Sequence, residues 1–583
     1  MSHDSINQVP NNRPQCSEVP DHIFDREWRN KKREDSREAP GNISINSNPG
    51  VDASQPPYEV NEDILDPGVI TQNLRIEALD PSFSLHELLQ SHDINFTLSP
   101  ESHQIDIKYR SPFSWTVWKK TGVLCGAFIA ALLAAYSAGA YALASEPLRA
   151  KWQVTSAEYN VGITLFVAGF GFAPMIMAPV SEAHGRYWVF VGAGAVFFLG
   201  TLGCAITSSY AGMLISRLVT GSGASIFATL VGGVVSDLFH KEDRNTPMAL
   251  YTMSIMIGTG LGPLVSGVVA DALGWKWIFW LQLIAIGLTT LSIFFFFDET
   301  RSNVLLNRKC ASLNQLYAET RLCTTKECEQ SVRHPRPIRL HFQAEQKDVP
   351  RINLAYIGRS FAFPLKLLVT EPVVFWFSAW VSFAWAILYM QFSSIGLTFR
   401  DVYRFTNTEV GAVYTAVVAG STLSTAISIV QDPILRRLWP HRMATPEGRL
   451  HSACIQSVLL PAGLFWFGWT ARRSISWAVP ATAVGACTMG IFSIYLAVFN
   501  YLADTYHRYA SSALAAQSMC RNLLAGIFPL VTDIMLRNLT YAGAGSLLGG
   551  IGVLLTGIPW LLSLFGQTIR ARSSFARELL EGQ

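Results

Sequence analysis

Long apolar runs constrain this chain more than any other feature of its sequence. Half of its 583 residues are apolar and 15% are charged, whereas a soluble domain has roughly 25% charged residues. From Thr121 onward, apolar runs recur at the length of about 20 residues that an α-helix needs to cross a hydrocarbon core. Backbone groups find no water in such a core, so each run predicts a helix. The twelve predicted spans lie near 121–143, 157–180, 189–208, 211–236, 248–271, 276–297, 371–398, 409–430, 452–470, 478–502, 511–536 and 543–567.

The spacing of these spans divides the chain into two bundles of six helices. The predicted fold class is therefore an all-α polytopic membrane protein with a 6+6 layout and a central loop. The N-terminal segment is polar and has no apolar core for a cleavable signal peptide, and it buries too little apolar surface to offset its ordering entropy. The predicted parts are a disordered tail at 1–110, a first bundle at 111–300, a central loop at 301–368, a second bundle at 369–570 and a tail at 571–583.

The distribution of Lys and Arg predicts the orientation in the membrane. The short loops carry eight such residues on each side, so they do not decide it. Lys119 and Lys120 precede the first span, Arg301 begins the central loop and Arg570 follows the last span. The positive-inside rule then places both termini and the central loop in the cytosol. The expected location is the plasma membrane, and the vacuole is the alternative. Asn538 begins a glycosylation sequon that would lie outside, close to the membrane, which would make the chain a glycoprotein.

A charged turn follows the second span and is a candidate gating motif. The sequence runs Ala178-Pro-Val-Ser-Glu182-Ala-His-Gly185-Arg186. Gly185 permits a tight reversal of the chain. Glu182 can pair with a cation or with a helix end, and Arg186 can anchor at the interface. The alternative is an ordinary solvated turn between two helices.

The fourth span contains a charged residue, Arg217, followed by Gly221. An arginine inside an apolar run is costly and usually faces a cavity or a partner. The alternative is that Arg217, which lies near the start of its span, extends its side chain to the interface.

The fifth span carries a run of small residues. Gly258, Gly262 and Ser266 recur at every fourth position, which places them on one helix face and allows close approach of a neighbouring helix. Pro263 removes a backbone hydrogen bond and permits a bend, and Gly267 follows it. Such a helix suits a carrier whose halves rock, although the pattern could serve packing alone.

These three segments, in this order, resemble the major facilitator superfamily. Further segments resemble its fungal twelve-helix drug:proton antiporter branch, among them Asp298-Glu299-Thr300-Arg301, Pro446-Glu447-x-Arg449-Leu450 and the run from Ser511 to Arg521. The likeness covers about 112–575. It implies a monomeric secondary transporter that exports a drug, toxin or secondary metabolite by proton antiport and alternating access. The Gly-Pro stretch in the fifth span is the feature that marks antiporters.

Carboxylates inside the membrane are the candidates for proton coupling. Asp533 lies within the eleventh span, Asp271 closes the fifth and Asp504 closes the tenth. For Asp271 and Asp504, an interfacial position without a coupling role is the alternative. No histidine lies in the middle of a span, which argues against a histidine relay.

Polar and aromatic residues near the middle of the later spans are candidates for a substrate cavity. An apolar wall with few polar contacts suits lipophilic ligands. The alternative for the aromatic residues is packing or contact with lipid. The candidate cavity residues are Trp385, Tyr389, Gln391, Asn500 and Arg521.

Other function classes find little support in the sequence. No Gly-Lys pair occurs, so an ATP-binding P-loop is excluded. The twelve histidines are dispersed, which argues against a metal-dependent membrane enzyme, and we expect no metal, no cofactor and no enzymatic activity. No basic domain points to nucleic acid. The expected partners are a small-molecule substrate, protons and the lipid bilayer. A facilitated-diffusion or uptake carrier, and a sensor built on a transporter fold, remain as alternatives.

Overall fold

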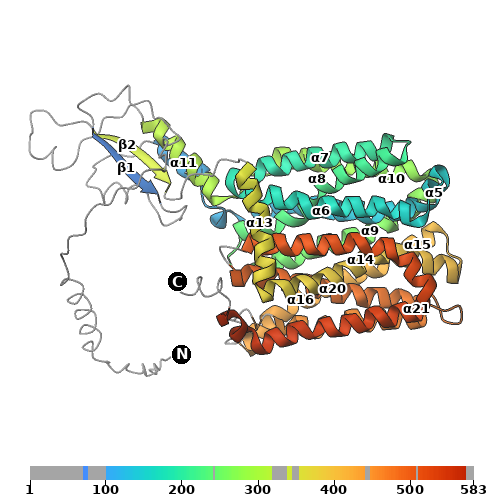
Figure 1. Cartoon of the computed structure of the whole chain (residues 1–583). Coiled ribbons are helices and arrows are strands. Elements are labelled where there is room, and N and C mark those ends of the chain that lie inside the picture. Colours follow the sequence, from blue (N-terminus) through green and yellow to red (C-terminus); the bar gives the residue numbers. More distant parts are fainter. Residues whose placement is uncertain are drawn as a thin grey trace, which may run out of the picture. The chain divides into compact units, whose positions relative to one another are not determined.

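Long helices dominate the chain in the computed structural model, and Figure 1 shows them running side by side. The structure describes residues 70–76, 100–240, 243–317, 338–344, 354–439, 447–448, 450–506 and 510–572.

The first bundle occupies the chain from Val117 to Phe296. Its first span is longer than the sequence predicts, because a 3-10 turn and a short helix continue it to Trp152. The elements are α4 (Val117–Ala140), η3 (Tyr141–Ala144), α5 (Ser145–Trp152), α6 (Ser156–His184), α7 (Arg186–Ile206), α8 (Tyr210–Leu238), α9 (Asn245–Leu273) and α10 (Trp275–Phe296).

The second bundle begins at Pro372. It consists of α14 (Pro372–Tyr403), α15 (Asn407–Val413), α16 (Thr415–Leu438), α18 (Leu450–Gln456), α19 (Leu459–Thr470), α20 (Ala478–Tyr506) and α21 (Ala510–Arg572). Helix α13 (Leu354–Thr370) leads into it.

A break at Thr540 divides α21 into two crossings. Its 63 residues would span about 95 Å as one helix, three times the hydrocarbon core. Thr540 has φ 60° and ψ 169°, so the helix is interrupted there. The described residues contain 11 apolar helical segments long enough to cross a membrane. Because the last of them holds two crossings, these segments amount to the twelve predicted spans in two sets of six.

A strand from the segment before the first span pairs with a strand from the central segment between the bundles. Strand β1 (Ile70–Ile76) pairs in parallel with β2 (Ile338–Ala344), with Ile70 opposite Ile338. The other elements here are α3 (Pro100–Lys108), η2 (Pro112–Ser114) and α11 (Ser302–Tyr317).

The tail at 1–110 therefore differs from the expected disorder in two stretches, β1 and α3. The physical reason is non-local, because each stretch has a partner in the central segment, more than 200 residues away. Asp106 of α3 pairs with Lys309 of α11 at 2.5 Å. The rest of the predicted tail, 1–69 and 77–99, lies outside the described residues.

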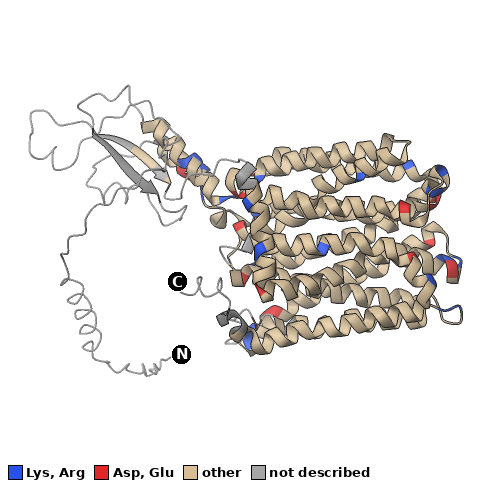
Figure 2. Cartoon of the chain, viewed as in Figure 1, with Lys and Arg blue, Asp and Glu red and all other residues tan. Residues whose placement is uncertain are grey.

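Charged residues lie mainly at the two ends of the spans (Figure 2). We call the end at which α4 begins and α10 passes into α11 the loop side, and the opposite end the far side. Because successive spans alternate in direction, α6, α8, α16 and α20 end on the loop side, and α9 and α14 end on the far side.

The two bundles meet tightly on the far side. A Cβ atom added to Gly267 would lie 2.6 Å from the backbone oxygen of Asn407, and one added to Gly411 would lie 3.0 Å from that of Pro263. Along the neighbouring interface between α6 and α21, Asn160 donates to the backbone oxygen of Pro529 at 2.8 Å. Only small residues such as Gly267 and Gly411 permit the close backbone contact between α9 and α15.

The small-residue face predicted in the fifth span packs on α4. A Cβ atom added to Gly262 would lie 2.5 Å from the backbone oxygen of Tyr136, and one added to Gly258 would lie 2.3 Å from that of Leu132. The spacing of four residues therefore produces a close contact between α9 and α4.

Replacing Gly262 with leucine should destabilise the fold, because the added side chain cannot enter this contact. We expect a loss of about 1–3 kcal/mol, the usual result of overpacking. The measurement is the melting temperature of the purified protein in detergent. Gly192→Leu is the matched control, since no atom lies within 4 Å of a Cβ at that exposed position in α7. Equal melting temperatures for the two variants would contradict this packing.

Candidate functional site

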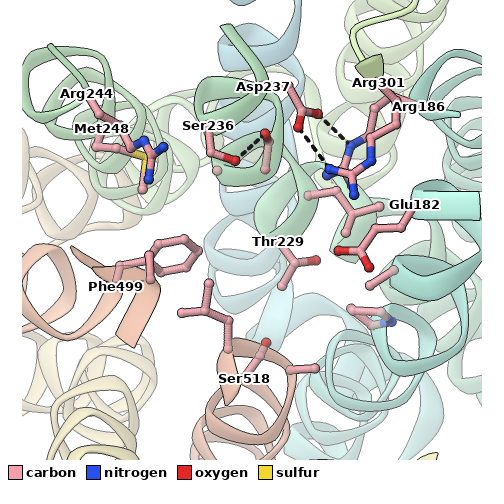
Figure 3. Close-up of a pocket in the computed structure, with 18 of the residues that line it drawn as sticks. Glu182, Arg186, Thr229, Ser236, Asp237, Arg244, Met248, Arg301, Phe499 and Ser518 are labelled. Atoms are coloured by element: carbon pink, nitrogen blue, oxygen red, sulfur yellow. Dashed lines mark hydrogen bonds and ion pairs between the residues drawn. The ribbon is translucent and has the colours of Figure 1, made fainter. Parts of the chain in front are cut away.

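A cavity of about 650 Å³ lies between the two bundles, and its mouth is on the loop side. Its walls come from α6, α8 and α9 of the first bundle and from α20 and α21 of the second (Figure 3). Pro174, Leu230, Met248, Phe499 and Leu514 give it an apolar lining, and its charged lining residues are Glu182, Arg186, Asp237, Arg244, Arg301 and Arg521.

A buried cluster of charges lies at the mouth. Asp237, near the end of α8, pairs with Arg186 and with Arg301 at 3.2 Å each. Arg186 also donates to the Ser181 hydroxyl at 2.7 Å. Arg186 and Asp237 are 3% and 8% exposed. Screening by solvent is weak at such burial, so this cluster ties α6, α7, α8 and the segment after α10 together.

The turn predicted as a gating motif is completed by Glu299. The Glu299 carboxylate accepts hydrogen bonds from the backbone N–H groups of Arg186 at 2.9 Å and Tyr187 at 3.2 Å. It thereby caps α7, where a negative charge is favourable. Gly185 has φ +102°, and any side chain there would overlap Glu299. The turn therefore needs glycine for two separate reasons.

Sequence reasoning missed Asp237 and the roles of Glu299 and Arg301. Asp237 lies at the end of an apolar run that offers no motif around it. In the sequence, the segment Asp298–Arg301 carries a family likeness, and Arg301 begins the central loop. A cluster of acidic and basic residues directly after an apolar run indicates a structured segment there. It does not indicate which turn that segment contacts.

Glu182 points into the cavity, as Figure 3 shows. It is half-buried. No hydrogen bond or ion pair joins its carboxylate to the described residues, whereas Asp237, the other carboxylate of the lining, has two arginine partners. Glu182 is thus the carboxylate of this wall that is available to a proton or a ligand.

Arg521 lies at the inner end of the cavity. It is 1% exposed, and its Nη2 atom donates to the Ser518 hydroxyl at 3.3 Å. The guanidinium carbon lies 4.4 Å from the ring centroid of Trp385 and 5.0 Å from that of Tyr495. Its Nε and Nη1 atoms are buried without a hydrogen-bond partner among the described residues.

The structure brings some of the predicted cavity residues together. Asn500 lines the cavity with Arg521, and it donates to Asn245 of the first bundle at 3.5 Å. Trp385 lies behind the wall in contact with Arg521. Tyr389 and Gln391 are buried in α14 and do not line the cavity.

Arg217 is buried and lies off the cavity. It is 1% exposed, which does not fit the interfacial alternative. Its Nη1 atom donates to the backbone oxygen of Ser137 at 3.1 Å, and its guanidinium lies between the rings of Tyr141 and Phe166. Gly221 packs directly against the backbone of Phe166. Both residues join α8 to its neighbours.

The three carboxylates considered for proton coupling lie away from the cavity. Asp271 accepts hydrogen bonds from Asn407 at 2.8 Å and from the Thr408 hydroxyl at 2.7 Å, across the far-side contact between the bundles. Asp533 is half-buried and pairs with Arg537 at 2.9 Å. Asp504 is buried near the loop-side end of α20.

Two other candidate features can be placed. Asn538 of the sequon is exposed on the far side, two residues before the break at Thr540. Among the described residues, no group of three or more His, Cys, Asp and Glu side chains could hold a metal ion.

Comparison with known proteins identifies relatives over most of the chain. The sequence profile of the Major Facilitator Superfamily matches residues 127–529. The chain is 28% identical to Multidrug transporter FLR2 of Candida glabrata, over 80% of this chain and 77% of that protein. It is 30% identical to Efflux pump FUB11 of Gibberella fujikuroi, over 72% of this chain and 70% of that protein.

A solved structure shares the fold. The proton:xylose symporter XylE, bound to 6-bromo-6-deoxy-D-glucose, aligns with a TM-score of 0.55 at 12% identity, over 77% of this chain and 97% of that one. At this identity the likeness supports the arrangement of helices alone.

Replacing Asp237 with asparagine should destabilise the protein strongly, because it leaves the buried Arg186 and the half-buried Arg301 without their counter-ion. We expect about 3–5 kcal/mol, the usual cost of breaking a buried pair. Asp432→Asn is the matched control. It breaks the pair with Arg436 within one helix, where both side chains are partly exposed, and should cost less than about 1 kcal/mol. Denaturation in detergent measures both, and similar losses would contradict a structural role for the buried cluster.

Proposed function

Because the chain belongs to the Major Facilitator Superfamily, we propose that it exports small organic molecules by proton antiport with alternating access. The observation that carries the proposal is the cavity between the two bundles, which is of a size for drug-like ligands and mostly apolar. The names of the relatives from Candida glabrata and Gibberella fujikuroi, a multidrug transporter and an efflux pump, support export as the direction.

The contacts between the bundles support alternating access. On the far side, Asp271 bridges to Asn407 and Thr408, and Arg400 pairs with Glu146 at 2.8 Å. On the loop side the cavity lies between the bundles, and a hydrogen bond from Asn500 to Asn245 at 3.5 Å also joins them there. Opening the far side requires the far-side polar contacts to break while the cavity closes, which is how a rocking pair of bundles exposes one site to each side in turn.

We further propose that the loop side faces the cytosol of a monomeric protein in the plasma membrane. The positive-inside distribution of Lys and Arg supports this orientation. The cavity would then be open to the compartment from which an exporter takes up its substrate.

Glu182 is the proposed site of proton exchange at the cavity. Its carboxylate lies on the cavity wall with no partner among the described residues, whereas Asp271 and Asp533 are held by hydrogen bonds or an ion pair on the far side. A carboxylate at the edge of a low-dielectric cavity can change its protonation as the cavity closes around it.

Export from cells that lack their own efflux pumps tests the function. Cells that express the protein are loaded with a panel of labelled lipophilic compounds, and efflux is measured with and without a protonophore. We expect efflux of at least one compound above that of cells without the protein, and its collapse when the protonophore is present. Efflux that persists would contradict proton coupling and indicate a facilitated-diffusion carrier.

The Glu182→Gln variant tests the proposed proton site in the same assay. We expect at least a tenfold loss of proton-driven efflux, on the scale of removing one coupled protonation step. Exchange of labelled for unlabelled substrate, which needs no net proton movement, should persist. Asp533→Asn is the control and should retain efflux. The opposite pattern would assign coupling to Asp533.

A further inference from the structure

A positive charge in the middle of the membrane has no counter-ion in the described part of the chain. Arg521 lies 11 residues after the start of α21, which is about 16 Å from the loop side. An arginine stays protonated in proteins, and an unpaired charge at this depth is costly. The carboxylates of the described spans lie within about two turns of a span end. None of their ion pairs includes Arg521.

The surrounding side chains stabilise Arg521 only in part. The rings of Trp385 and Tyr495 lie against the guanidinium, a contact that favours a cation. Among the described residues, its one hydrogen bond goes to Ser518, and its Nε and Nη1 atoms have no acceptor. These are charged donors, and leaving them unpaired in a buried site is costly.

Another buried arginine, Arg217, shows what a structural role looks like in this fold, although its Nη2 atom also has no partner among the described residues. Arg217 also lies between aromatic rings, but its Nε and Nη1 atoms donate to the backbone oxygens of Gly162 and Ser137. It does not line the cavity. Among the described residues Arg521 has no such backbone acceptors, and it does lie in the wall of the cavity, where a ligand could supply one.

Two further buried polar groups surround Arg521 without partners. Gln517 lies one turn earlier on the same face of α21, 1% exposed, and neither atom of its amide has a hydrogen-bond partner among the described residues. The indole Nε1 of Trp385 is likewise buried and unpartnered. Gln517 and Trp385 do not line the cavity, but with Arg521 they place four unpartnered donor nitrogens and one unpartnered acceptor oxygen beside its wall, counted among the described residues.

We propose that the transported molecule is a lipophilic organic acid whose carboxylate binds Arg521 at the inner end of the cavity. The planar guanidinium matches a carboxylate with two parallel hydrogen bonds, and the pairing is strong where water is excluded. The rest of the cavity suits such a molecule, because its walls are largely apolar and its four arginines exceed its two carboxylates by two charges. The inference rests on the proposed function for transport, but binding can be measured without it.

Ligand binding to the purified wild-type protein tests the proposal first. The probes are 1-naphthaleneacetic acid, indole-3-acetic acid and 4-phenylbutyric acid, each paired with its primary carboxamide of nearly the same shape. Affinity is measured at neutral pH from the thermal shift in detergent. We expect at least one acid to bind at least tenfold more tightly than its amide, as a charge-assisted pair requires. Equal affinities throughout would overturn the proposal.

Variants then assign the preference to Arg521. In Arg521→Gln the acid should lose at least about tenfold in affinity while its amide changes less than twofold. Arg521→Lys keeps the charge without the two parallel hydrogen bonds, so its affinity for the acid should lie between those of the wild type and Arg521→Gln. Arg472→Gln is the matched control, because Arg472 also lies over a tryptophan ring, that of Trp469, but is exposed on the far side. An unchanged acid preference in both Arg521 variants would overturn the proposal.

The outcomes separate this proposal from the proposed function. Binding of acids that depends on Arg521, with no efflux of those acids from cells, would leave the anion site intact and contradict export. Efflux of neutral compounds, with no preference for acids in the binding assay, would leave export intact and contradict the anion site.

Discussion

The absence of water from the membrane core is the constraint on which the rest of this structure depends. It requires every backbone group of a span to find its partner within a helix, and it pushes charged side chains to the span ends. At the loop side, Arg186 and Arg301 follow it by pairing with Asp237, and Glu299 does so by accepting a hydrogen bond from the backbone N–H of Arg186. Asp271 obeys it at the far side with Asn407 and Thr408.

The departures from this constraint indicate where function lies. Arg217 satisfies most of its donors within the first bundle and holds three helices together. Arg521 leaves two donors unpaired beside a cavity. A polar group that the fold itself does not satisfy is a cost, and a bound ligand is one way to remove it. The same reasoning distinguishes Glu182 from Asp237 on the cavity wall.

Much of the fold could be predicted from the sequence because its signal is local. Apolar runs of sufficient length predict the spans, including the break near Thr540, and a spacing of four residues predicts the close contact of Gly262 with α4. The pairing of β1 with β2, and of Glu299 with the turn at Gly185, could not be predicted, because each joins segments more than 100 residues apart. For the candidate site, the sequence suggested Arg521 and Asn500 as cavity residues but also Tyr389 and Gln391, which the structure places away from it. Which residues of a span face the cavity depends on how its helix is rotated relative to the other bundle. The sequence of one span does not specify that rotation.

Two distances, measured across the two ends of the molecule, test most directly whether its halves rock around the cavity. Spin labels would be placed on His240 and Arg437 at the loop side, and on Leu273 and Arg473 at the far side, in a background without native cysteines. Double electron–electron resonance spectroscopy then gives both distance distributions, with and without a bound ligand and at two pH values. The account predicts that the loop-side distance shortens as the far-side distance lengthens. Two distributions that stay fixed under all conditions, or that lengthen together, would contradict alternating access.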